Sequence, residues 1–208
     1  MKKQINIIII LLFINIAAYA SNINFNSGYT TLSMQEGNKK VSLSNSAYVQ
    51  IDDLEITAEQ ITLSGEDYKY VECVENITFY DRENEITLKC SSLKYNQETQ
   101  VLVINGWNEI NDTKNSIYAT SSYLEYNLDA MTLDLMIEVK LLHDSDDKIM
   151  KCNSDTLRFD LDNNILSLLG SSKVDWDSNT YQANAMTINL NNNDISMDGN
   201  IEANIYTN

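Results

Sequence analysis

Apolar residues recur along this chain in pairs, and one polar residue separates the two members of each pair. Counted from the first apolar residue of a unit, apolar residues stand at +2, +9 and +11, and glycine or another apolar residue stands at +13. Units begin at Ile61, Leu93, Leu124, Leu157 and Met186, and in the first of them the second strand comes one residue late. The spacing of two is typical of β-strands with one buried face. The interval of 29 to 33 residues between units indicates an array of one supersecondary unit.

Two kinds of polar turn separate the strands. One lies inside each unit, as in "NQETQ" (96–100) and "DLDNN" (160–164), and the other joins successive units, as in "DRENE" (81–85). Asn and Asp tolerate left-handed dihedrals and bond their own backbone, so they suit such turns. Because the connections are short, neighbouring strands must run antiparallel. With the segments 23–34 and 41–51, the pattern predicts an all-β fold, an antiparallel meander of repeated hairpins with about a dozen strands.

The N-terminus has the features of an export signal. Two lysines precede an apolar run over residues 5–16, and "AYA" (18–20) is a small-x-small cleavage site. The run is shorter than the ~20 residues that span a bilayer, which favours a cleaved signal over a retained anchor. We therefore expect a signal peptide over 1–20, export to the periplasm, and one domain over 21–208.

The charge balance narrows the range of partners. The chain has 14 Lys+Arg and 30 Asp+Glu, a net charge of −16, and removal of two lysines with the signal leaves 12 against 30, or −18. Nucleic acid binding depends on neutralising phosphates with basic residues, so we expect no nucleic acid partner. The negative net charge also disfavours simple electrostatic binding of anionic lipid head groups. A lipid partner must therefore be held mainly through its apolar part.

The sequence contains no set of side chains that points to catalysis. His143 is the only histidine and stands in "LLHDSDDK", so we expect a solvated loop residue outside any multi-histidine metal site. "DLDNNILSLLGS" begins like a calcium loop, but Ile165 replaces its sixth-position glycine and Ser171 its twelfth-position glutamate. No serine stands in a G-x-S-x-G elbow. We predict a protein that is not an enzyme and that needs no metal or cofactor.

The three cysteines leave at least one thiol unpaired. Cys73 and Cys90 flank the "DRENE" turn and could face each other across a hairpin, but a register cannot be read to one residue from sequence. The alternative, which we favour, is that Cys73, Cys90 and Cys152 are buried small apolar residues.

The repeat resembles a known family. The segments "AYVQIDDLEITAEQITLSG", "ITLKCSSLKYNQETQVLVINGWNEIND", "TLRFDLDNNILSLLGSSKVDW" and "YQANAMTINLNNNDISMDGNIEA" resemble the OstA-like domain of the LptA family, over roughly residues 41–203. These periplasmic proteins carry lipopolysaccharide from the inner to the outer membrane. A small residue three positions before each apolar start belongs to the resemblance, and it is Ala58, Cys90, Ser121, Ser154 and Ala183.

The resemblance implies an open β-jellyroll whose apolar interior holds acyl chains. It implies lipopolysaccharide or a related amphiphile as cargo, other Lpt-type transport components as partners, and a head-to-tail homo-oligomer. We expect the oligomer contact between residues 200–206 and residues 41–51 of the next molecule. The groove-lining residues would be Ile61, Leu63, Leu93, Tyr95, Leu102, Ile104, Leu124, Tyr126, Leu133, Leu135, Leu157, Phe159, Leu166, Leu168, Met186 and Ile188.

Two other interpretations stay open. The same apolar ladder can be the closed core of a self-assembling structural protein of the cell envelope. A retained N-terminal segment would instead indicate a membrane-anchored, LptC-like component. Under the groove hypothesis Leu124, Leu157 and Phe159 face acyl chains and are not packed on all sides by protein, whereas under the closed-core hypothesis they are.

Overall fold

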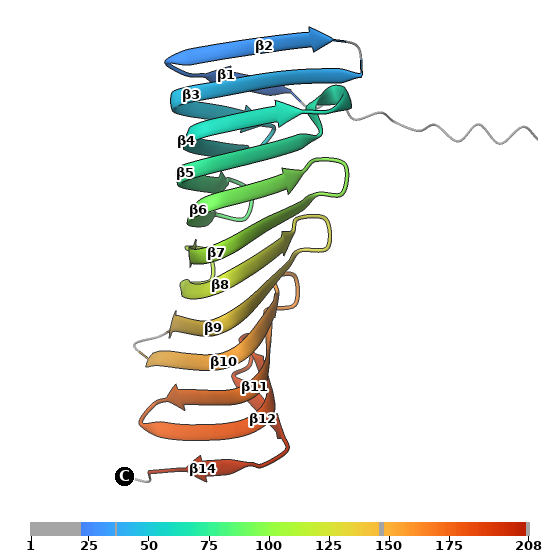
Figure 1. The fold of residues 1–208 in the computed structure, drawn as a ribbon. Coiled ribbons are helices and arrows are strands. Elements are labelled where there is room, and N and C mark those ends of the chain that lie inside the picture. Colours follow the sequence, from blue (N-terminus) through green and yellow to red (C-terminus); the bar gives the residue numbers. More distant parts are fainter. Residues whose placement is uncertain (1–21, 36, 146–147, 207–208) are drawn as a thin grey trace, which may run out of the picture.

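The computed structural model describes residues 22–35, 37–145 and 148–206, so the expected signal peptide (1–20) lies outside the described residues. Within them, fourteen strands form one antiparallel sheet, accompanied by a short 3-10 helix, η1 (Glu66–Tyr68) (Figure 1). The strands are β1 (Ile23–Asn26), β2 (Tyr29–Gln35), β3 (Asn38–Ile51), β4 (Leu54–Ser64), β5 (Tyr70–Asp81), β6 (Ile86–Asn96), β7 (Val101–Asp112), β8 (Ile117–Asn127), β9 (Thr132–Ser145), β10 (Lys148–Asp160), β11 (Ile165–Trp176), β12 (Asn179–Asn189), β13 (Asp194–Asp198) and β14 (Glu202–Asn204).

The strands stack in chain order, which confirms the antiparallel meander. β3 to β12 are ten continuous strands, each paired with its neighbours in sequence. At the N-terminal end β1 and β2 both pair with β3, and at the C-terminal end β13 and β14 both pair with β12, so each end is one strand split in two. The sheet is therefore a stack of ten whole strands and two split ones, close to the expected dozen.

The expected oligomer contact at residues 41–51 is wrong. These residues belong to β3, which pairs with β1 and β2 on one side and with β4 on the other. A strand with both edges paired has no free backbone groups to offer a neighbour. The N-terminal edge of the sheet is formed by β1 and β2 instead.

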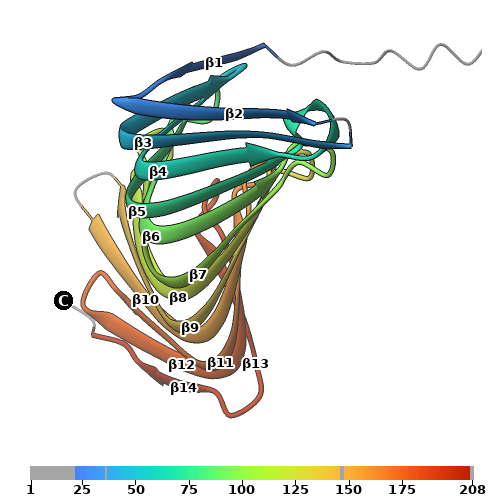
Figure 2. The ribbon, with the colours of Figure 1, turned by 45° about the horizontal axis from the view of Figure 1, so that its top comes forward.

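Every long strand bends at its middle, which gives the sheet a V-shaped cross-section (Figure 2). The register shifts at each bend, for example between Ser44 and Ala47, between Asn105 and Asn108, and in the other long strands. β-Bulges of this kind kink a strand and re-aim its side chains. The odd-numbered strands have left-handed backbone at the bend.

The +13 position of the sequence repeat marks these bends. Gly106, Gly170 and Gly199 all have positive φ, between 68° and 120°. At Gly170 a Cβ atom would also lie 2.9 Å from the Cβ of Asp155, so this bend requires glycine. Ile137 occupies the same position at φ 66°, which is strained for a β-branched residue.

The even-numbered strands have the small residues of the repeat at the inner side of the bend. Ala58, Ser121, Ser154 and Ala183 are buried there. The inner side of a V is concave, so side chains from neighbouring strands converge and leave room only for short ones. The glycine and the small residue of the repeat therefore serve the same bend from adjacent strands.

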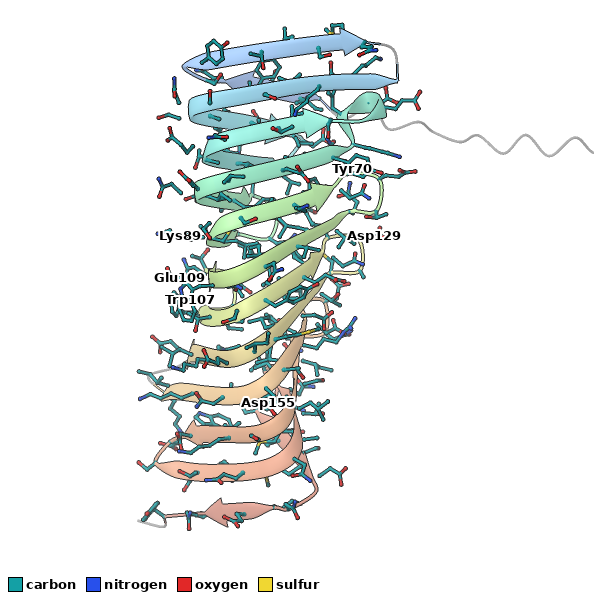
Figure 3. The ribbon with its side chains drawn as sticks, in the orientation of Figure 1. Tyr70, Lys89, Trp107, Glu109, Asp129 and Asp155 are labelled. Atoms are coloured by element: carbon teal, nitrogen blue, oxygen red, sulfur yellow. The ribbon has the colours of Figure 1, made fainter. Side chains whose placement is uncertain are left out.

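The bend divides the sheet into two walls that face each other. The repeat wall contains the predicted apolar ladder, and the second wall contains the strand halves that join successive units. The repeat wall comprises residues 40–44, 60–64, 70–74, 92–96, 101–105, 123–127, 132–136, 156–160, 165–169, 185–189 and 194–198. The second wall comprises residues 47–51, 54–58, 77–81, 86–90, 108–112, 117–121, 139–145, 148–154, 172–176 and 179–183. The core lies between the two walls, and outward-facing residues such as Trp107, 53% exposed, cover the outside (Figure 3).

His143 is not the loop residue that the sequence predicts. It lies in β9, opposite Ile117 and Met150, and is half-buried. Burial lowers the pKa of its imidazole. The prediction failed because the second wall stays extended up to the rim, so polar residues that look like a turn are still part of the strand.

The register does not place Cys73 opposite Cys90. Cys73 pairs with Leu93, and Cys90 pairs with Ile77. All three cysteines are free, with Cys73 and Cys152 buried and Cys90 half-buried. Burial raises the pKa of the Cys73 and Cys152 thiols to about 12 and that of Cys90 to about 11, so all three are poor nucleophiles.

Candidate functional site

The interior between the walls is a continuous apolar column. All sixteen residues that the sequence assigns to the groove lie on the inner face of the repeat wall, and each is at most 2% exposed. They pair across neighbouring strands, as Ile104 does with Leu124 and Leu157 does with Leu168. Successive units therefore extend one apolar surface along the length of the stack.

The second wall supplies the other half of this interior, which the sequence repeat did not identify. Its inner side chains include Ile56, Phe79, Leu88, Ile110 and Val174, each at most 1% exposed. Their signal was present, because "ITFYD" and "ITLKC" alternate with the same period of two. In the even-numbered strands the bend shifts the phase of this alternation, so that β6 has Ile86 and Leu88 inward before the bend and Leu93 and Tyr95 inward after it.

The inner side chains of the two walls pack against each other. Leu124 is 0% exposed, and Leu157 and Phe159 are each 2% exposed. The open space expected around these middle-unit side chains is therefore not present. An acyl chain could enter only if the walls moved apart or the side chains rearranged.

The interior is less well covered at the N-terminal end. Leu32 pairs with the buried Val41, and Phe25 pairs with the buried Val49, so both lie on the inner face. They are nevertheless 57% and 44% exposed, and Met34 on the same face is 68% exposed. Apolar surface of this kind at the end of a stack is a feature of protein or ligand contact sites.

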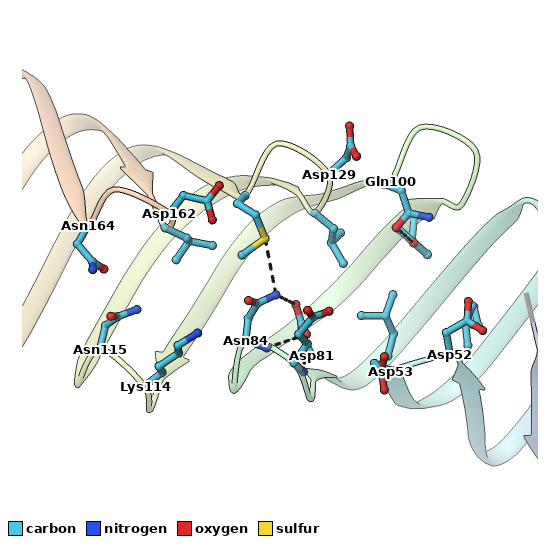
Figure 4. Close-up of a pocket in the computed structure, with 17 residues that line it drawn as sticks. Asp52, Asp53, Asp81, Asn84, Gln100, Lys114, Asn115, Asp129, Asp162 and Asn164 are labelled. Carbon is cyan, nitrogen blue, oxygen red and sulfur yellow. Dashed lines mark hydrogen bonds between the residues drawn. The ribbon is translucent and has the colours of Figure 1, made fainter. Parts of the chain in front are cut away.

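The edges of the V opposite the bend form a long opening, here called the mouth. Turns 52–53, 82–85 and 113–116 of the second wall face turns 97–100, 128–131 and 161–164 of the repeat wall across a cavity of about 770 Å³ (Figure 4). Backbone hydrogen bonds between successive turns of one wall, such as Leu128 N–H to Gln100 O at 2.9 Å, make each rim continuous. The lining includes Ile51, Leu54, Tyr95, Leu128, Met131 and Leu161 among apolar and aromatic residues, and Asn84, Gln100, Asn115 and Asn164 among amides.

The mouth cavity is acidic. Its charged residues are Asp52, Asp53, Asp81, Glu83, Asp129, Asp162 and Lys114. Six carboxyl groups against one ammonium group disfavour direct contact with an anionic head group. The mouth therefore contributes little attraction to a phosphate, in agreement with the overall charge of the chain.

A buried hydrogen-bond network joins the two walls across the mouth. Tyr126 of the repeat wall donates its hydroxyl to Asp81 Oδ2 of the second wall at 2.7 Å. Asn84 Nδ2 donates to the same oxygen at 2.8 Å and lies 3.8 Å from the sulfur of Met131, on the opposite rim (Figure 4). Tyr126 is 0% and Asp81 2% exposed. We call Tyr126, Asp81, Asn84 and Met131 the cross-wall network.

The turns of the second wall are themselves built on a repeated Asp-x-x-Asn pattern. Asp112 accepts bonds from the backbone N–H of Asn115 at 2.9 Å and from its amide Nδ2 at 2.7 Å, and Asp81 holds Asn84 in a similar way. Burial raises the pKa of Asp112 although both bonds oppose the shift. These carboxyl groups are explained by turn structure and need no catalytic role.

Over residues 22–35, 37–145 and 148–206, no three side chains of His, Cys, Asp or Glu gather as a metal site would require. Within the same residues no helix is long and apolar enough to span a bilayer.

A V-shaped antiparallel stack with an apolar interior and an unpaired edge at each end defines a β-jellyroll of the LptA type. No protein-family model matches the sequence, and no curated protein is similar to it. Among solved structures, the fold is similar to that of LptH, the LptA-homologous periplasmic component of the conserved lipopolysaccharide transport device of Pseudomonas aeruginosa. The TM-score is 0.56 at 15% sequence identity, and the match covers 61% of this chain and 99% of LptH. The fold is therefore LptA-like.

Proposed function

We propose that this chain is a periplasmic lipid-transport protein that carries lipopolysaccharide or a related amphiphile between the inner and outer membranes. The observation that carries the proposal is the uninterrupted apolar interior between two walls, in a fold similar to that of LptH. Residues 1–20 would be removed on export, and residues 21–208 would form the working domain. Its partners would be other Lpt-type components, and it would catalyse no reaction.

In this proposal the walls separate to admit acyl chains, and the sixteen inner residues of the repeat wall contact them. Each side chain already lies in an apolar environment, so exchange of protein contacts for acyl contacts costs little hydrophobic free energy. The acidic rims then keep the head group outside, because they offer no pocket of basic residues.

Site-specific crosslinking tests this proposal directly. A photoreactive residue placed at Leu157, which faces inward at 2% exposure, should crosslink to lipopolysaccharide in the bacterial periplasm. The matched control is Arg158, the next residue, which faces outward and is exposed. Lipid adducts at position 157 and not at 158 are the expected result. Equal labelling at the two positions, or none at 157 together with a clean lipid-free native mass spectrum, would contradict the proposal.

The proposal includes end-to-end assembly through the two split strands. β1 and β2 form one free edge and β13 and β14 the other, and apolar residues near the C-terminal edge, Ile201 and Ile205, are 54% and 64% exposed. Free edges pair with strands of other molecules through backbone hydrogen bonds. The contact would therefore join β13 and β14 of one molecule to β1 and β2 of the next.

Deletion of residues 200–208 should convert the oligomer to monomers, because it removes β14 and half of the C-terminal edge. Deletion of residues 205–208 alone keeps β14 and serves as the control. Sedimentation velocity at several concentrations gives the measurement. A concentration-dependent oligomer that survives the longer deletion would exclude this edge as the contact.

A structural protein with a dry core is the second candidate, and the close packing of the inner side chains favours it. Leu102, Ile104, Leu124 and Tyr126 are all 0% exposed. This candidate predicts polymers that form without lipid and no adduct at position 157, so the crosslinking experiment separates the two functions.

A further inference from the structure

Two serine hydroxyls lie without hydrogen-bond partners at the deepest part of the interior. Ser154 of β10 and Ser172 of β11 are 7% and 1% exposed and face inward at the bend. They lie within the same register shift between neighbouring strands, since Asn153 pairs with Lys173 on one side of it and Thr156 with Leu169 on the other. Among the described residues, neither Oγ atom has a partner.

The equivalent serine two strands earlier is satisfied. Ser121 of β8, at the same inner position of the bend as Ser154, has two acceptors within reach of its hydroxyl, Asn108 Oδ1 at 3.0 Å and Tyr123 O at 2.8 Å. Asn108 and Ser121 are both 0% exposed. A buried serine hydroxyl at this bend can therefore be hydrogen-bonded within the protein, whereas the hydroxyls of Ser154 and Ser172 are not.

Packing does not explain the two hydroxyls. At the position of Ser154 β4 has Ala58 and β12 has Ala183, and at the position of Ser172 β5 has Ile77 and β9 has Val139, all buried, so the fold accepts side chains without an oxygen at both places. The surroundings of the pair are apolar, with Cys152 1% and Val174 0% exposed on the same strands. An unpaired hydroxyl in such surroundings is destabilising, and a hydrogen-bond partner beside it would be stabilising.

We propose that Ser154 and Ser172 form a polar subsite that binds an oxygen function, a hydroxyl or an ester oxygen, along the acyl chain of the bound lipid. The inference rests on the proposed lipid-carrying function and adds selectivity to it. A hydrocarbon chain without oxygen leaves both hydroxyls unpaired, whereas a hydroxylated chain accepts from one serine and donates to the other. Sites with buried groups that hydrogen-bond a ligand hydroxyl discriminate strongly against the analogue that lacks it.

A cycle of protein and ligand variants tests the subsite. The ligands are stearate, a hydroxystearate with its hydroxyl near the carboxyl end, and a hydroxystearate with its hydroxyl at mid-chain. Comparison of the two hydroxystearates shows which position along the acyl chain the two serines contact. The proteins are the wild type, the double variant Ser154→Ala/Ser172→Ala, and the control Ser121→Ala. Affinity is measured by displacement of a fluorescent fatty acid, and the free energy of unfolding is measured without lipid.

The double variant should lower the preference for at least one hydroxystearate over stearate by about five- to tenfold, the value of one hydrogen bond. Ser121→Ala should leave that preference unchanged, because its hydroxyl is already bonded within the protein. Without lipid, the double variant should be at least as stable as the wild type, and Ser121→Ala should be less stable.

The outcomes separate the subsite from the transport function. If the wild type binds stearate and both hydroxystearates but the double variant keeps the same preference, the subsite is wrong and the lipid-carrying function stands. If the double variant is clearly destabilised without lipid, the hydroxyls are bonded within the protein or to buried water, and the subsite is again wrong. If the wild type binds none of the three, the lipid-carrying function fails and this inference fails with it.

Discussion

Replacing Phe159 by Asp should unfold the lipid-free protein. Phe159 is 2% exposed, on the inner face of the repeat wall between Leu133 and Leu166 of the neighbouring strands. The substitution removes a large apolar side chain, which alone costs about 3–5 kcal/mol, and buries a carboxylate with no cation nearby. The total is comparable with the 5–15 kcal/mol that typically stabilises a domain. Circular dichroism melting should show loss of the cooperative transition or a large fall in its midpoint.

The control is Ser167→Asp, which adds the same carboxylate to the outer face of the adjacent strand. Ser167 is exposed and lies opposite Arg158, so the new charge meets water and a cation. This variant should melt within a few degrees of the wild type. If Phe159→Asp also stays folded, the walls must separate in solution without lipid, and the closed interior would not be the main state of the protein.

The sequence predicted the repeat wall well because nothing interrupts its pattern. From Leu93 to Ile104 a strand, an Asx-rich turn and a second strand follow without a gap, so a period of two is visible over the whole hairpin. The turn was predicted to within one residue, since β6 ends at Asn96, the first residue of the polar run "NQETQ", and β7 begins at Val101, directly after it.

The second wall was not predicted because bends interrupt the apolar pattern and polar residues occupy some of the wall's core positions. After Ile104 the chain passes Gly106 in a left-handed conformation, and the next inward residues are Asn108 and Ile110. An even spacing is kept, but the polar Asn108 occupies a core position where its amide serves Ser121. A polar residue satisfied inside the core cannot be told from a surface residue without the structure.

The edge strands at the two ends of the stack were harder still to predict, because their pairing depends on contacts that are distant in sequence. Residues 23–34 read as one apolar and polar strand, but Ser27 and Gly28 divide them into β1 and β2. Both halves then cover β3, which moves the free edge away from residues 41–51. The alternation of apolar and polar residues predicts which face of a strand is buried, but it does not predict which strands pair with it.

The cross-wall network makes Tyr126 a test of how the interior opens. Its hydroxyl donates to Asp81 Oδ2 at 2.7 Å across the mouth, whereas Tyr95, at the same place one unit earlier, donates to Gln100 Oε1 at 2.9 Å within its own wall. Burial raises the pKa of both phenols, so both remain donors at neutral pH. The two tyrosines therefore differ mainly in whether their bond joins the walls.

Tyr126→Phe should destabilise the lipid-free protein by about 2 kcal/mol, since it removes a donor from a buried carboxyl group. Tyr95→Phe should cost about 1 kcal/mol, the value of a bond between neutral partners. If wall separation limits lipid entry, loss of the cross-wall bond should also speed uptake of a fluorescent acyl lipid by up to about tenfold, because 1.4 kcal/mol in the opening equilibrium is a factor of ten. Stopped-flow fluorescence on the two variants gives both rates. Faster uptake by Tyr126→Phe alone would identify the mouth as the entry route, whereas unchanged rates in both variants would mean that lipid enters elsewhere, for example at the exposed N-terminal end beside Phe25 and Leu32.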